Sequence, residues 1–566
     1  MTDYLSILRQ YWGYDSFRGI QQDIIESIGS GKDTLGLMPT GGGKSVTFQV
    51  PALAMEGMCL VITPLIALMK DQVSHLKGQG IRALAIYAGM TRSEISQTID
   101  NAIFGGYKFL YVSPERLETD AFRLRLKQMH ISMIVVDECH CISQWGYDFR
   151  PSYLRIADIR SIMPEVPVLA LTATATPEVV ADIQHQLRFR QENVFRMSFE
   201  RANLAYCVRK ADDKRGQLLH ILSSVPGSAI IYVRNRKRTK EVAEMLQHEK
   251  VSATYYHAGL EQVVRDMRQR EWQEGKCRVI VATNAFGMGI DKPDVRLVIH
   301  IDIPDSVEAY FQEAGRAGRD GRKSYAVLVY DNSDLTTLRR RVAETFPDKD
   351  YIRDVYEKLQ FYYQMAMGDG LGCVKEFKID DFCVKFKLFP VQADSALRIL
   401  TQAGYIAYTD EQHRASRLMF TMQRDELYKL QRLSDEADRL IQTTLRCYTG
   451  LFSDYAYIDE ELLALRTYLT HDQVYHIFRF LSQQHIVSYI PAKSTPYIIY
   501  TRERVEKRHL VIPPSAYEDR KERMTGRVEA MIRYVQNQVT CRSRLLLSYF
   551  GEENSHQCGQ CDICRQ

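Results

Sequence analysis

Two short segments carry side chains that together could bind and hydrolyse a nucleotide. The first runs from Met38 to Ser45 and places three consecutive glycines before a lysine and a serine. Such glycines let the backbone wrap a polyphosphate with inward-pointing N–H groups, while the lysine reaches the β/γ-phosphates and the hydroxyl ligates magnesium. Taken alone, a glycine-rich segment is often an ordinary turn. The residues predicted to hold the nucleotide here are Thr40, Gly41, Gly42, Gly43, Lys44 and Ser45.

The second segment supplies the acidic groups. Asp137 and Glu138 end the apolar run 134–136, which is typical of a buried parallel strand. At the end of such a strand, Asp137 can join Ser45 in holding Mg²⁺ while Glu138 polarises the attacking water. The two segments together predict ATP hydrolysis.

A third segment, 310–321, is rich in arginine and small residues. Arg316 and Arg319 lie three apart, on one face of a helix, and a guanidinium matches phosphate oxygens. We predict that they stabilise charge on the γ-phosphoryl as an arginine finger, with Gln312 helping to position that group. The alternative is a solvated basic helix. If the finger and the phosphate loop lie on different lobes, closure of the lobes completes the site, as in a motor.

A fourth cluster lies at the C-terminal end, where Cys541 precedes Cys558, Cys561 and Cys564. Four thiolates with two tight spacings favour a closed tetrahedral Zn²⁺ site that contributes folding energy rather than catalysis. An iron–sulfur cluster is the rival interpretation, and a disulfide is less expected in a cytoplasmic chain.

Size and composition set limits on the class of protein. The chain has 566 residues, 45% of them hydrophobic, and a net charge of +4, so any nucleic-acid binding must come from local patches. No apolar run reaches membrane-spanning length, and the N-terminus lacks a signal-peptide pattern. These features predict a cytoplasmic protein with no membrane partner.

Strand-like runs alternate with helical patterns twice along the chain, which predicts two tandem α/β units joined around residues 195–210. In the first unit the expected strands are Thr34–Met38, Cys59–Thr63, Phe109–Val112, Met133–Val136 and Val168–Leu171. In the second unit they are Ala229–Val233, Thr254–Tyr256, Val279–Ala282, Leu297–Ile301 and Ala326–Tyr330.

Helical periodicity dominates after about residue 345, where an internal duplication is visible. Residues 397–402 resemble residues 478–483, at an offset of 81. Each copy follows a short helix (near 380–386 and 459–465). Each is followed by two strand-like runs, 405–408 then 418–422 in one copy and 486–490 then 497–501 in the other. Two helices and a hairpin are typical of a winged helix; two packing modules without a ligand are the alternative.

These motifs resemble those of superfamily 2 helicases, and more narrowly of RecQ-type DNA helicases, over residues 1–340 and 541–564. The resemblance implies that Tyr14 stacks on the adenine while Arg18 and Gln21 contact the nucleotide. It also implies that Thr63 and Pro64, with the segments 113–116, 171–175 and 281–291, grasp a DNA strand or couple it to the nucleotide.

The most family-specific segment is 141–151, which resembles the RecQ aromatic-rich loop. Trp145 and Phe149 offer flat surfaces for unstacked bases, and Arg150 can meet a phosphate. Tyr147 stands where the family often has histidine. The zinc cluster is also RecQ-like, although about two hundred residues separate it from the helicase core.

The resulting prediction is an ATP-dependent 3′–5′ DNA helicase of RecQ type, acting on single-stranded and forked DNA with ATP, Mg²⁺ and Zn²⁺. An RNA helicase and a DNA-binding regulator with a vestigial motor are the alternatives. The predicted fold has two RecA-like parallel-sheet domains, mostly helical winged-helix-like modules and a small zinc subdomain. Their predicted boundaries are 1–200, 201–345, 346–425, 426–530 and 531–566.

Overall fold

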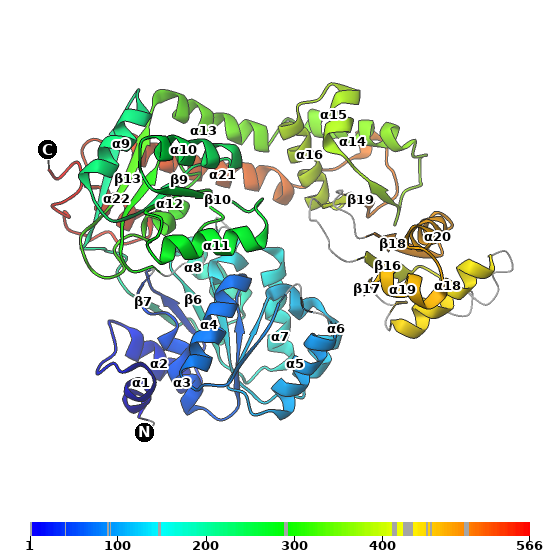
Figure 1. The fold of residues 1–566 in the computed structure, drawn as a ribbon, viewed down its shortest axis with the longest axis horizontal. Helices are drawn as coiled ribbons and strands as arrows, with labels where there is room; N and C mark the ends of the chain where they lie inside the picture. The colour runs from blue at the N-terminus through cyan, green and yellow to red at the C-terminus, as the bar shows by residue number, and fades with distance from the viewer. Residues whose placement is uncertain are drawn as a thin grey trace. The chain divides into compact units, whose positions relative to one another are not determined.

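The computed structural model describes residues 3–39, 41–87, 90, 92–144, 146, 149–287, 292–409, 416–422, 434–448, 451–452, 455–491 and 497–565. They form two compact units. The first comprises Met1–Leu338 with Gly526–Gln566, and the second comprises Arg339–Thr525 (Figure 1). No helix among the described residues is long and apolar enough to cross a bilayer.

The first unit contains two parallel sheets, each in a lobe of its own. The first lobe has seven strands in the order β3-β4-β2-β5-β6-β1-β7. They are β1 (Thr34–Leu37), β2 (Met58–Ile62), β3 (Ala83–Ile86), β4 (Phe109–Val112), β5 (Ile131–Asp137), β6 (Val168–Thr172) and β7 (Val194–Arg196). Strands β1, β2, β4 and β6 are buried throughout, because helices cover a parallel sheet on both faces.

The helices of this lobe follow the strands in alternation. They are α1 (Tyr4–Trp12), α2 (Gln21–Gly29), α3 (Val46–Ala54), α4 (Ile66–Gly78), α5 (Arg92–Phe104), α6 (Asp120–Leu126), α7 (Ile156–Ile162) and α8 (Pro177–Gln186). In the register, β6 lies between β1 and β5, so the phosphate loop after β1 and the acidic residues after β5 end at the same edge of the sheet.

The second lobe has six parallel strands in the order β10-β11-β9-β12-β13-β8. They are β8 (Leu204–Lys210), β9 (Ser228–Tyr232), β10 (Ala253–Tyr256), β11 (Val279–Ala282), β12 (Val295–His300) and β13 (Ser324–Tyr330). Its helices are α9 (Lys214–Ser224), α10 (Arg236–His248), α11 (Gln262–Gln273), α12 (Val307–Ala314) and α13 (Asn332–Thr345). The predicted tandem α/β arrangement is confirmed, with each predicted strand within two residues of its observed bounds at either end.

The second unit holds two small antiparallel sheets and two separate apolar cores. Its helices are α14 (Lys349–Tyr363), α15 (Ile379–Phe386), α16 (Pro390–Gln402), α18 (Asp435–Cys447), α19 (Glu460–Thr467) and α20 (His471–Gln483). Its strands are β14 (Val374–Glu376), β15 (Ile406–Thr409), β16 (Ser416–Phe420), β17 (Ala456–Ile458), β18 (Val487–Ile490) and β19 (Tyr497–Tyr500).

The structure supports the internal duplication. Lys387 is the C-cap residue of helix α15, and Tyr468, 81 residues later, is the C-cap residue of helix α19. Both residues adopt the left-handed conformation. This is an uncommon way for a non-glycine residue to end a helix. The same 81-residue offset separates the first residues of α16 and α20, and those of β15 and β18. The two modules therefore share one helix–helix–strand plan.

The hairpins predicted within each copy are wrong. Strand β15 pairs with β19, not with β16, and β16 pairs with β17 and β18. The central strand of each sheet therefore follows the other copy in the sequence: β19 follows the second copy and completes the sheet of the first, and β16 follows the first copy and completes the sheet of the second. Residues 416–490 are thus inserted between β15 and β19, two neighbouring strands of one sheet. The consecutive modules predicted at 346–425 and 426–530 differ from this nested order. Either strand can fill the same central place. Six residues separate β15 from β16 and β18 from β19, more than the two-residue loops that most strongly fix a strand to its sequence neighbour.

After the second module, the chain returns to the first unit through α21 (Glu518–Gln536) and ends with α22 (Arg542–Tyr549) and the cysteine-rich segment. Cys541 is the N-cap residue of α22.

Candidate functional site

The phosphate loop joins β1 to α3. Gly41 and Gly43 have φ angles of 85° and 75°, a conformation that side-chain-bearing residues rarely adopt. Helix α3 begins directly after the loop, and its first N–H groups, those of Val46, Thr47 and Phe48, donate to the carbonyls of Gly43, Lys44 and Ser45. The positive end of the α3 dipole therefore lies at the position where a polyphosphate would bind. The Ser45 side chain makes no capping hydrogen bond, which leaves its hydroxyl for another ligand. Thr40 lies outside the described residues.

Lys44 and the acidic pair meet across the edge of the sheet. The Lys44 Nζ lies 3.6 Å from Glu138 Oε1, and both side chains are largely buried. Burial alone would lower the pKa of Lys44, but the carboxylates of Glu138 and Asp137 more than offset that effect and leave its pKa raised. Lys44 is therefore held in its charged form beside the loop.

Burial raises the pKa of Asp137 to about 6, with a partial opposing effect from Lys44 and a reinforcing one from the neighbouring Glu138. Burial also acts on Glu138, but Lys44, His140 and Arg316 together leave the pKa of Glu138 lowered. Glu138 therefore stays ionised at a pH at which Asp137 begins to take a proton, near pH 6. Its Oε2 is buried and accepts no hydrogen bond from the described residues, so it can accept one from a water.

Glu138 also adopts a left-handed backbone conformation, with φ 49° and ψ 44°. For a residue with a Cβ this costs about 1 kcal/mol or more, and such strain is concentrated at functional sites. The turn changes the direction of the chain directly after β5. The side chains of Asp137 and Glu138 therefore need not point to opposite faces of the sheet, as consecutive residues of a strand do.

A path of close polar contacts leads from Glu138 to the next strand. The ring Nδ1 of the buried His140 lies 3.5 Å from Glu138 Oε2 and 2.8 Å from the hydroxyl oxygen of Thr172. Thr172 lies in the segment 171–175, and its hydroxyl also binds the backbone of Thr174. The structure therefore links the acidic residues to the segment that was predicted to couple nucleotide and DNA.

The second lobe contributes arginines through the turn after α12. Arg316 is buried and donates a hydrogen bond to the carbonyl of Gly287, and its charge contributes to lowering the pKa of Glu138. A Cβ on Gly41 would lie 3.6 Å from Arg319 Cγ, which places the stem of Arg319 against the phosphate loop. Gln312 is half-buried on α12. The predicted arginines therefore do not face bulk solvent; they face the nucleotide residues of the first lobe.

Two residues that sequence reasoning missed hold this arginine turn. Arg201 donates hydrogen bonds to the carbonyls of Gly315, Ala317 and Gly318 at 3.1, 2.9 and 3.1 Å. The side-chain amide of Asn203 donates to the same Gly318 carbonyl at 2.7 Å. Both lie in the connection between the lobes, where a single arginine carries no motif. Their contacts to backbone leave no pattern in the sequence.

The segment predicted to read the adenine is ordered beside the phosphate loop. The Gln21 amide nitrogen donates to the carbonyls of Gly42 and Gly43 at 3.2 and 3.1 Å, and its oxygen accepts from the Arg18 N–H at 2.9 Å. The ring of Tyr14 is about half exposed, and the Arg18 guanidinium lies 5.3 Å from its centroid. An exposed ring next to an amide suits a base, and this role stays a prediction.

Among the residues predicted to contact DNA, Thr63 is buried at the end of β2 and Pro64 is half-buried after it. Phe149 and Arg150 are half-buried, and the Arg150 N–H donates to the carbonyl of Cys141, which closes the base of the aromatic loop. Trp145, Tyr147 and Asp148 in this loop, and the segment 288–291, lie outside the described residues. The DNA contacts themselves stay predictions.

The four C-terminal cysteines form a zinc site. Their sulfur atoms all lie within 4.8 Å of one another, as a single tetrahedral ion requires. Backbone N–H groups of Cys558, Cys561 and Cys564 each donate to a cysteine sulfur at 3.3–3.4 Å, which stabilises thiolates. All four positions are taken by protein, so the ion has a structural role.

The zinc subdomain is attached to the second lobe and to the connection between the lobes. Asp562 pairs with the buried Arg542 through two contacts of 3.1 Å and accepts from the N–H of Val208 in β8. The carboxylate of Glu552 accepts hydrogen bonds of 2.7 Å from Ser198 and from the N–H of Phe199. These contacts fix the chain that enters the second lobe.

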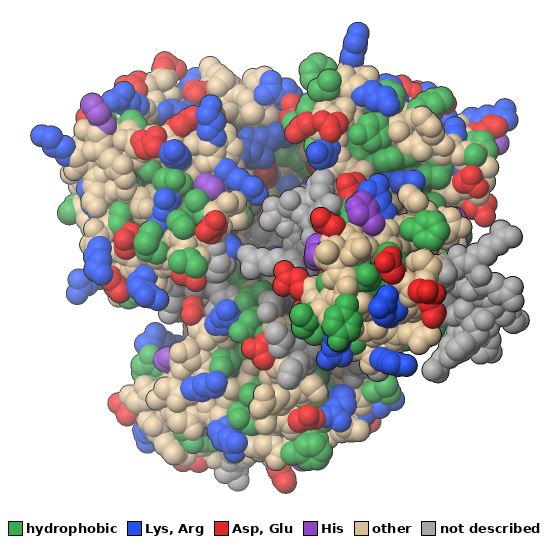
Figure 2. All heavy atoms as spheres, turned by 45° about the vertical axis from the view of Figure 1, so that its right-hand side comes forward, with side chains coloured by type: hydrophobic (Ala, Val, Ile, Leu, Met, Phe, Trp, Pro, Cys, Tyr) green, Lys and Arg blue, Asp and Glu red, His purple; other side chains and the backbone are tan. Residues whose placement is uncertain are grey.

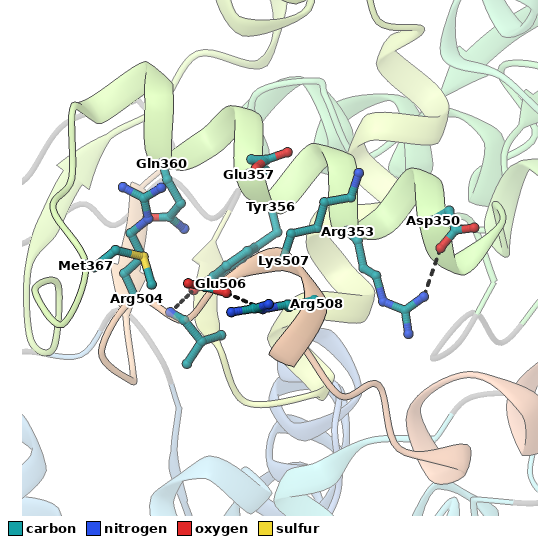
Figure 3. Close-up of a pocket in the computed structure, with 11 residues that line it drawn as sticks. Asp350, Arg353, Tyr356, Glu357, Gln360, Met367, Arg504, Glu506, Lys507 and Arg508 are labelled. Atoms are coloured by element: carbon teal, nitrogen blue, oxygen red, sulfur yellow. Dashed lines mark hydrogen bonds and ion pairs between the residues drawn. The ribbon is translucent and has the colours of Figure 1, made fainter.

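Charge on the molecular surface is mixed in sign. Figure 2 shows acidic and basic side chains interspersed over one face, as the small net charge of +4 leads one to expect. An open pocket of about 740 Å³ lies in the second unit, between α14 and the segment 504–508 (Figure 3). Two of its arginines pair with carboxylates, Arg353 with Asp350 and Arg508 with Glu506, so the pocket presents no single-sign field to a ligand.

Four family matches cover most of the chain. Residues 18–183 match the DEAD/DEAH box helicase family and residues 213–321 match the helicase conserved C-terminal domain. Residues 418–491 match the RecQ helicase winged-helix domain of Bacteroidota, and residues 499–565 match the RecQ zinc-binding domain. The winged-helix match begins in β16 and ends just after β18, in agreement with the nested module.

Two curated relatives show how far the similarity extends. The ATP-dependent DNA helicase RecQ of Pasteurella multocida is 43% identical over 341 residues, which are 60% of this chain and 54% of the relative. The probable ATP-dependent DNA helicase RecS of Bacillus subtilis is 41% identical over 365 residues, 64% of this chain and 73% of the relative. The match therefore spans only about half the length of the Pasteurella protein.

A solved structure supports the fold. The DUF1998 helicase MrfA bound to DNA superposes with a TM-score of 0.50 at 17% identity, over 60% of this chain and 50% of that one. Together with the zinc cluster, the nucleotide residues and the two relatives, these matches settle the family. This chain belongs to the RecQ family of helicases.

Proposed function

We propose that the protein is an ATP-dependent DNA helicase that translocates 3′ to 5′ on single-stranded DNA and unwinds forked duplexes, in DNA repair or recombination. The observation that carries this proposal is the convergence of two lobes on one site. Lys44 and Glu138 come from the first lobe, and Arg316 from the second lobe acts electrostatically on Glu138. Hydrolysis at such a site can open and close the lobes.

Each residue has a separate role in this scheme. The loop residues Gly41–Ser45 bind the phosphates with backbone N–H groups, and Lys44 neutralises their charge. Ser45 and Asp137 would hold Mg²⁺, which would neutralise part of the phosphate charge when bound. Glu138 orients the water, and Arg319, with Arg316 and Gln312, stabilises the charge that develops on the γ-phosphoryl.

Strand engagement is coupled to this site through short structural paths. Thr63 and Pro64 lie at the edge of the sheet where the nucleotide residues lie, and contacts of this kind position a strand without reading its sequence. The aromatic loop begins directly after His140, which contacts both Glu138 and Thr172. Bases stacked on Trp145 and Phe149 would therefore act on the residue that orients the water.

The first test is ATP turnover with and without single-stranded DNA. Lys44→Ala should abolish DNA-stimulated hydrolysis, whereas Lys32→Ala, an exposed lysine just before β1, should retain it. Retained turnover in Lys44→Ala would contradict the proposed nucleotide site. Binding of DNA with no ATP turnover in the unaltered chain would instead favour a regulator with a vestigial motor.

An RNA helicase remains the second candidate function, because a mimivirus relative that is 40% identical carries the name of a putative ATP-dependent RNA helicase. Stimulation of turnover by single-stranded DNA, compared with RNA of the same length, separates the two. Unwinding of 3′-tailed, 5′-tailed and forked duplexes then tests polarity, and a preference for 5′ tails would refute it.

A cytoplasmic location is part of the same proposal. All 12 cysteines lie within the described residues and none of them forms a disulfide. Apart from the four cysteines of the zinc site, eight thiols without a disulfide are typical of a reducing compartment.

A further inference from the structure

Arg527, near the middle of α21, contacts both lobes of the first unit. Its Nη2 donates a 2.8 Å hydrogen bond to the carbonyl of Gly146, in the aromatic loop of the first lobe. Its Nε lies 3.8 Å from the carboxylate of Glu308, in the first turn of α12 in the second lobe. One guanidinium thus bridges the loop predicted to stack on bases and the helix that leads to the arginine turn.

The second-lobe end of this bridge is a buried carboxylate. Glu308 is only 5% exposed, and its Oε1 accepts a 2.8 Å hydrogen bond from the Tyr549 hydroxyl. Its Oε2 is buried without a hydrogen-bond partner among the described residues. Arg527 is the one basic side chain of the described part of the chain within 4.0 Å of it. A buried carboxylate depends strongly on its cation, so the position of α12 depends on where that guanidinium lies.

The first-lobe end is a backbone position with little freedom to move alone. Gly146 is buried, and its N–H donates to the carbonyl of Ser143 at 2.9 Å. A Cβ at Gly146 would lie only 2.4 Å from the carbonyl oxygen of His140. The turn is therefore packed directly on His140, whose ring lies against Glu138 and Thr172.

Helix α12 is held along its length by the same C-terminal segment. The ring of Tyr534 in α21 lies 5.2 Å from the ring of Tyr310, and Phe550 lies 5.0 Å from Phe311. These contacts make α12 and the zinc subdomain one packed body, so a force on Arg527 is carried to the turn that holds Arg316.

We propose that Arg527 is a positioning residue that transmits engagement of a DNA strand from the aromatic loop to the arginine turn. The inference rests on the proposed function. A DNA strand that stacks on the loop displaces Gly146 and thereby weakens or strengthens its hydrogen bond with Arg527. The guanidinium then moves, which changes its distance from the carboxylate of Glu308. Helix α12 then shifts relative to the phosphate loop. The zinc subdomain, by this argument, takes part in coupling and not only in folding.

The test compares three variants of the full-length chain. Arg527→Ala removes the bridge, and Arg527→Lys keeps a positive charge near Glu308 but cannot present the same planar fork to two acceptors. Arg533→Ala is the matched control, because Arg533 is exposed on the same helix. We expect the ratio of ATP turnover with saturating oligo(dT) to turnover without DNA to fall about fivefold in both Arg527 variants, the loss expected for one hydrogen bond. Arg533→Ala should keep the ratio.

A second measurement separates bridging from general stability. Hydrogen exchange of residues 307–314 should change on addition of oligo(dT) in the unaltered chain and in Arg533→Ala, but not in Arg527→Lys. An unchanged stimulation ratio in Arg527→Lys, or an equal exchange response in α12, would overturn the inference. If DNA does not stimulate turnover of the unaltered chain at all, the proposed function fails instead. The exchange response of α12 to DNA then still decides whether the bridge exists.

Discussion

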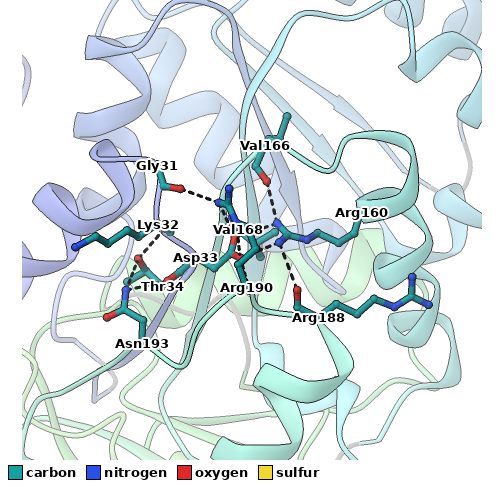
Figure 4. Close-up of polar contacts among 10 residues, drawn as sticks. All are labelled: Gly31, Lys32, Asp33, Thr34, Arg160, Val166, Val168, Arg188, Arg190 and Asn193. Carbon is teal, nitrogen blue, oxygen red and sulfur yellow. Dashed lines mark hydrogen bonds and ion pairs between the residues drawn. The ribbon is translucent and has the colours of Figure 1, made fainter.

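The residue Asp33, at the start of β1, offers a sharp test of what holds the nucleotide-binding lobe together. Its carboxylate is buried and receives hydrogen bonds from the Arg160 guanidinium at 2.9 and 2.7 Å and from the N–H groups of Val168 and Arg190 at 3.0 and 2.9 Å (Figure 4). The cluster fastens β1 to β6 at the end of the sheet opposite the phosphate loop. Asp33→Asn keeps the shape and removes the charge.

The magnitude follows from burial. The Arg160 side chain is only 7% exposed, so the substitution leaves a buried cation without its carboxylate, which costs about 3–5 kcal/mol. Burial would raise the pKa of Asp33, but hydrogen bonds from Arg190, Arg160 and Val168 leave it below the ordinary value of 3.8. A lowered pKa in the folded state contributes stability above about pH 4, and that stability is lost as the pH falls through the folded-state value.

The assay is native-state hydrogen exchange of β1 and β6, because a chain with several domains does not unfold in one step. We expect the free energy of opening of these strands to fall by about 3–5 kcal/mol in Asp33→Asn at pH 7. Asp158→Asn is the control: its carboxylate pairs with Arg123 at 3.1 Å but is 35% exposed, so about 0–1 kcal/mol is expected. Equal effects of the two substitutions would refute the reasoning.

Three further predictions concern the site. Arg201→Gln should release the arginine turn and so lower kcat for ATP hydrolysis on the order of 10- to 100-fold, with KM for ATP nearly unchanged. Steady-state kinetics measure both constants, and Arg209→Ala, at an exposed site, is the control. The pKa of Asp137 is raised to about 6, so its carboxyl takes a proton below pH 6, and the affinity for Mg²⁺ in the presence of nucleotide should fall between pH 7 and 5.5. Asp137→Asn should reduce this dependence to the part that comes from protonation of the nucleotide phosphates. Removal of zinc by a chelator should unfold residues 541–564, because the free energy of Zn²⁺ binding to a structural site of this kind is roughly 10 kcal/mol or more. It should also raise hydrogen exchange at the Val208 N–H, which donates to Asp562.

The α/β lobes were predictable because their signals are local. Strands such as Phe109–Val112 and Val279–Ala282 are short apolar runs, and the structure reproduces both with the same bounds. The nucleotide residues follow these runs directly. A parallel sheet brings the ends of its strands to one edge, so strand prediction alone implies that Lys44 and Asp137 lie close together.

The pairing in the second unit was not predictable by the same means. Strands β16 and β19 both carry buried apolar residues, each follows a copy of the same helix pair, and each could complete either sheet. The choice between a hairpin and the nested order is decided by long-range packing. Two separate cores form around the helix pairs, one including Ile498 and Tyr500 from β19 and the other including Leu418 and Phe420 from β16. No local pattern records which strand goes to which core.

The residues missed at the site share a physical reason. Arg201, Asn203 and Arg527 act on backbone carbonyls, and a carbonyl exists at every position, so the sequence offers no complementary partner to search for. A side-chain pair such as Lys44 and Glu138 can be inferred from two motifs, whereas a cation that holds a turn can be inferred only once the turn has been placed. The strained backbone at Glu138 is similar, because its left-handed conformation opposes its own preference and is stabilised only by its surroundings. The residues predicted to bind and hydrolyse the nucleotide can thus be proposed from the sequence, whereas the contacts that hold them in place can be recognised only in the fold.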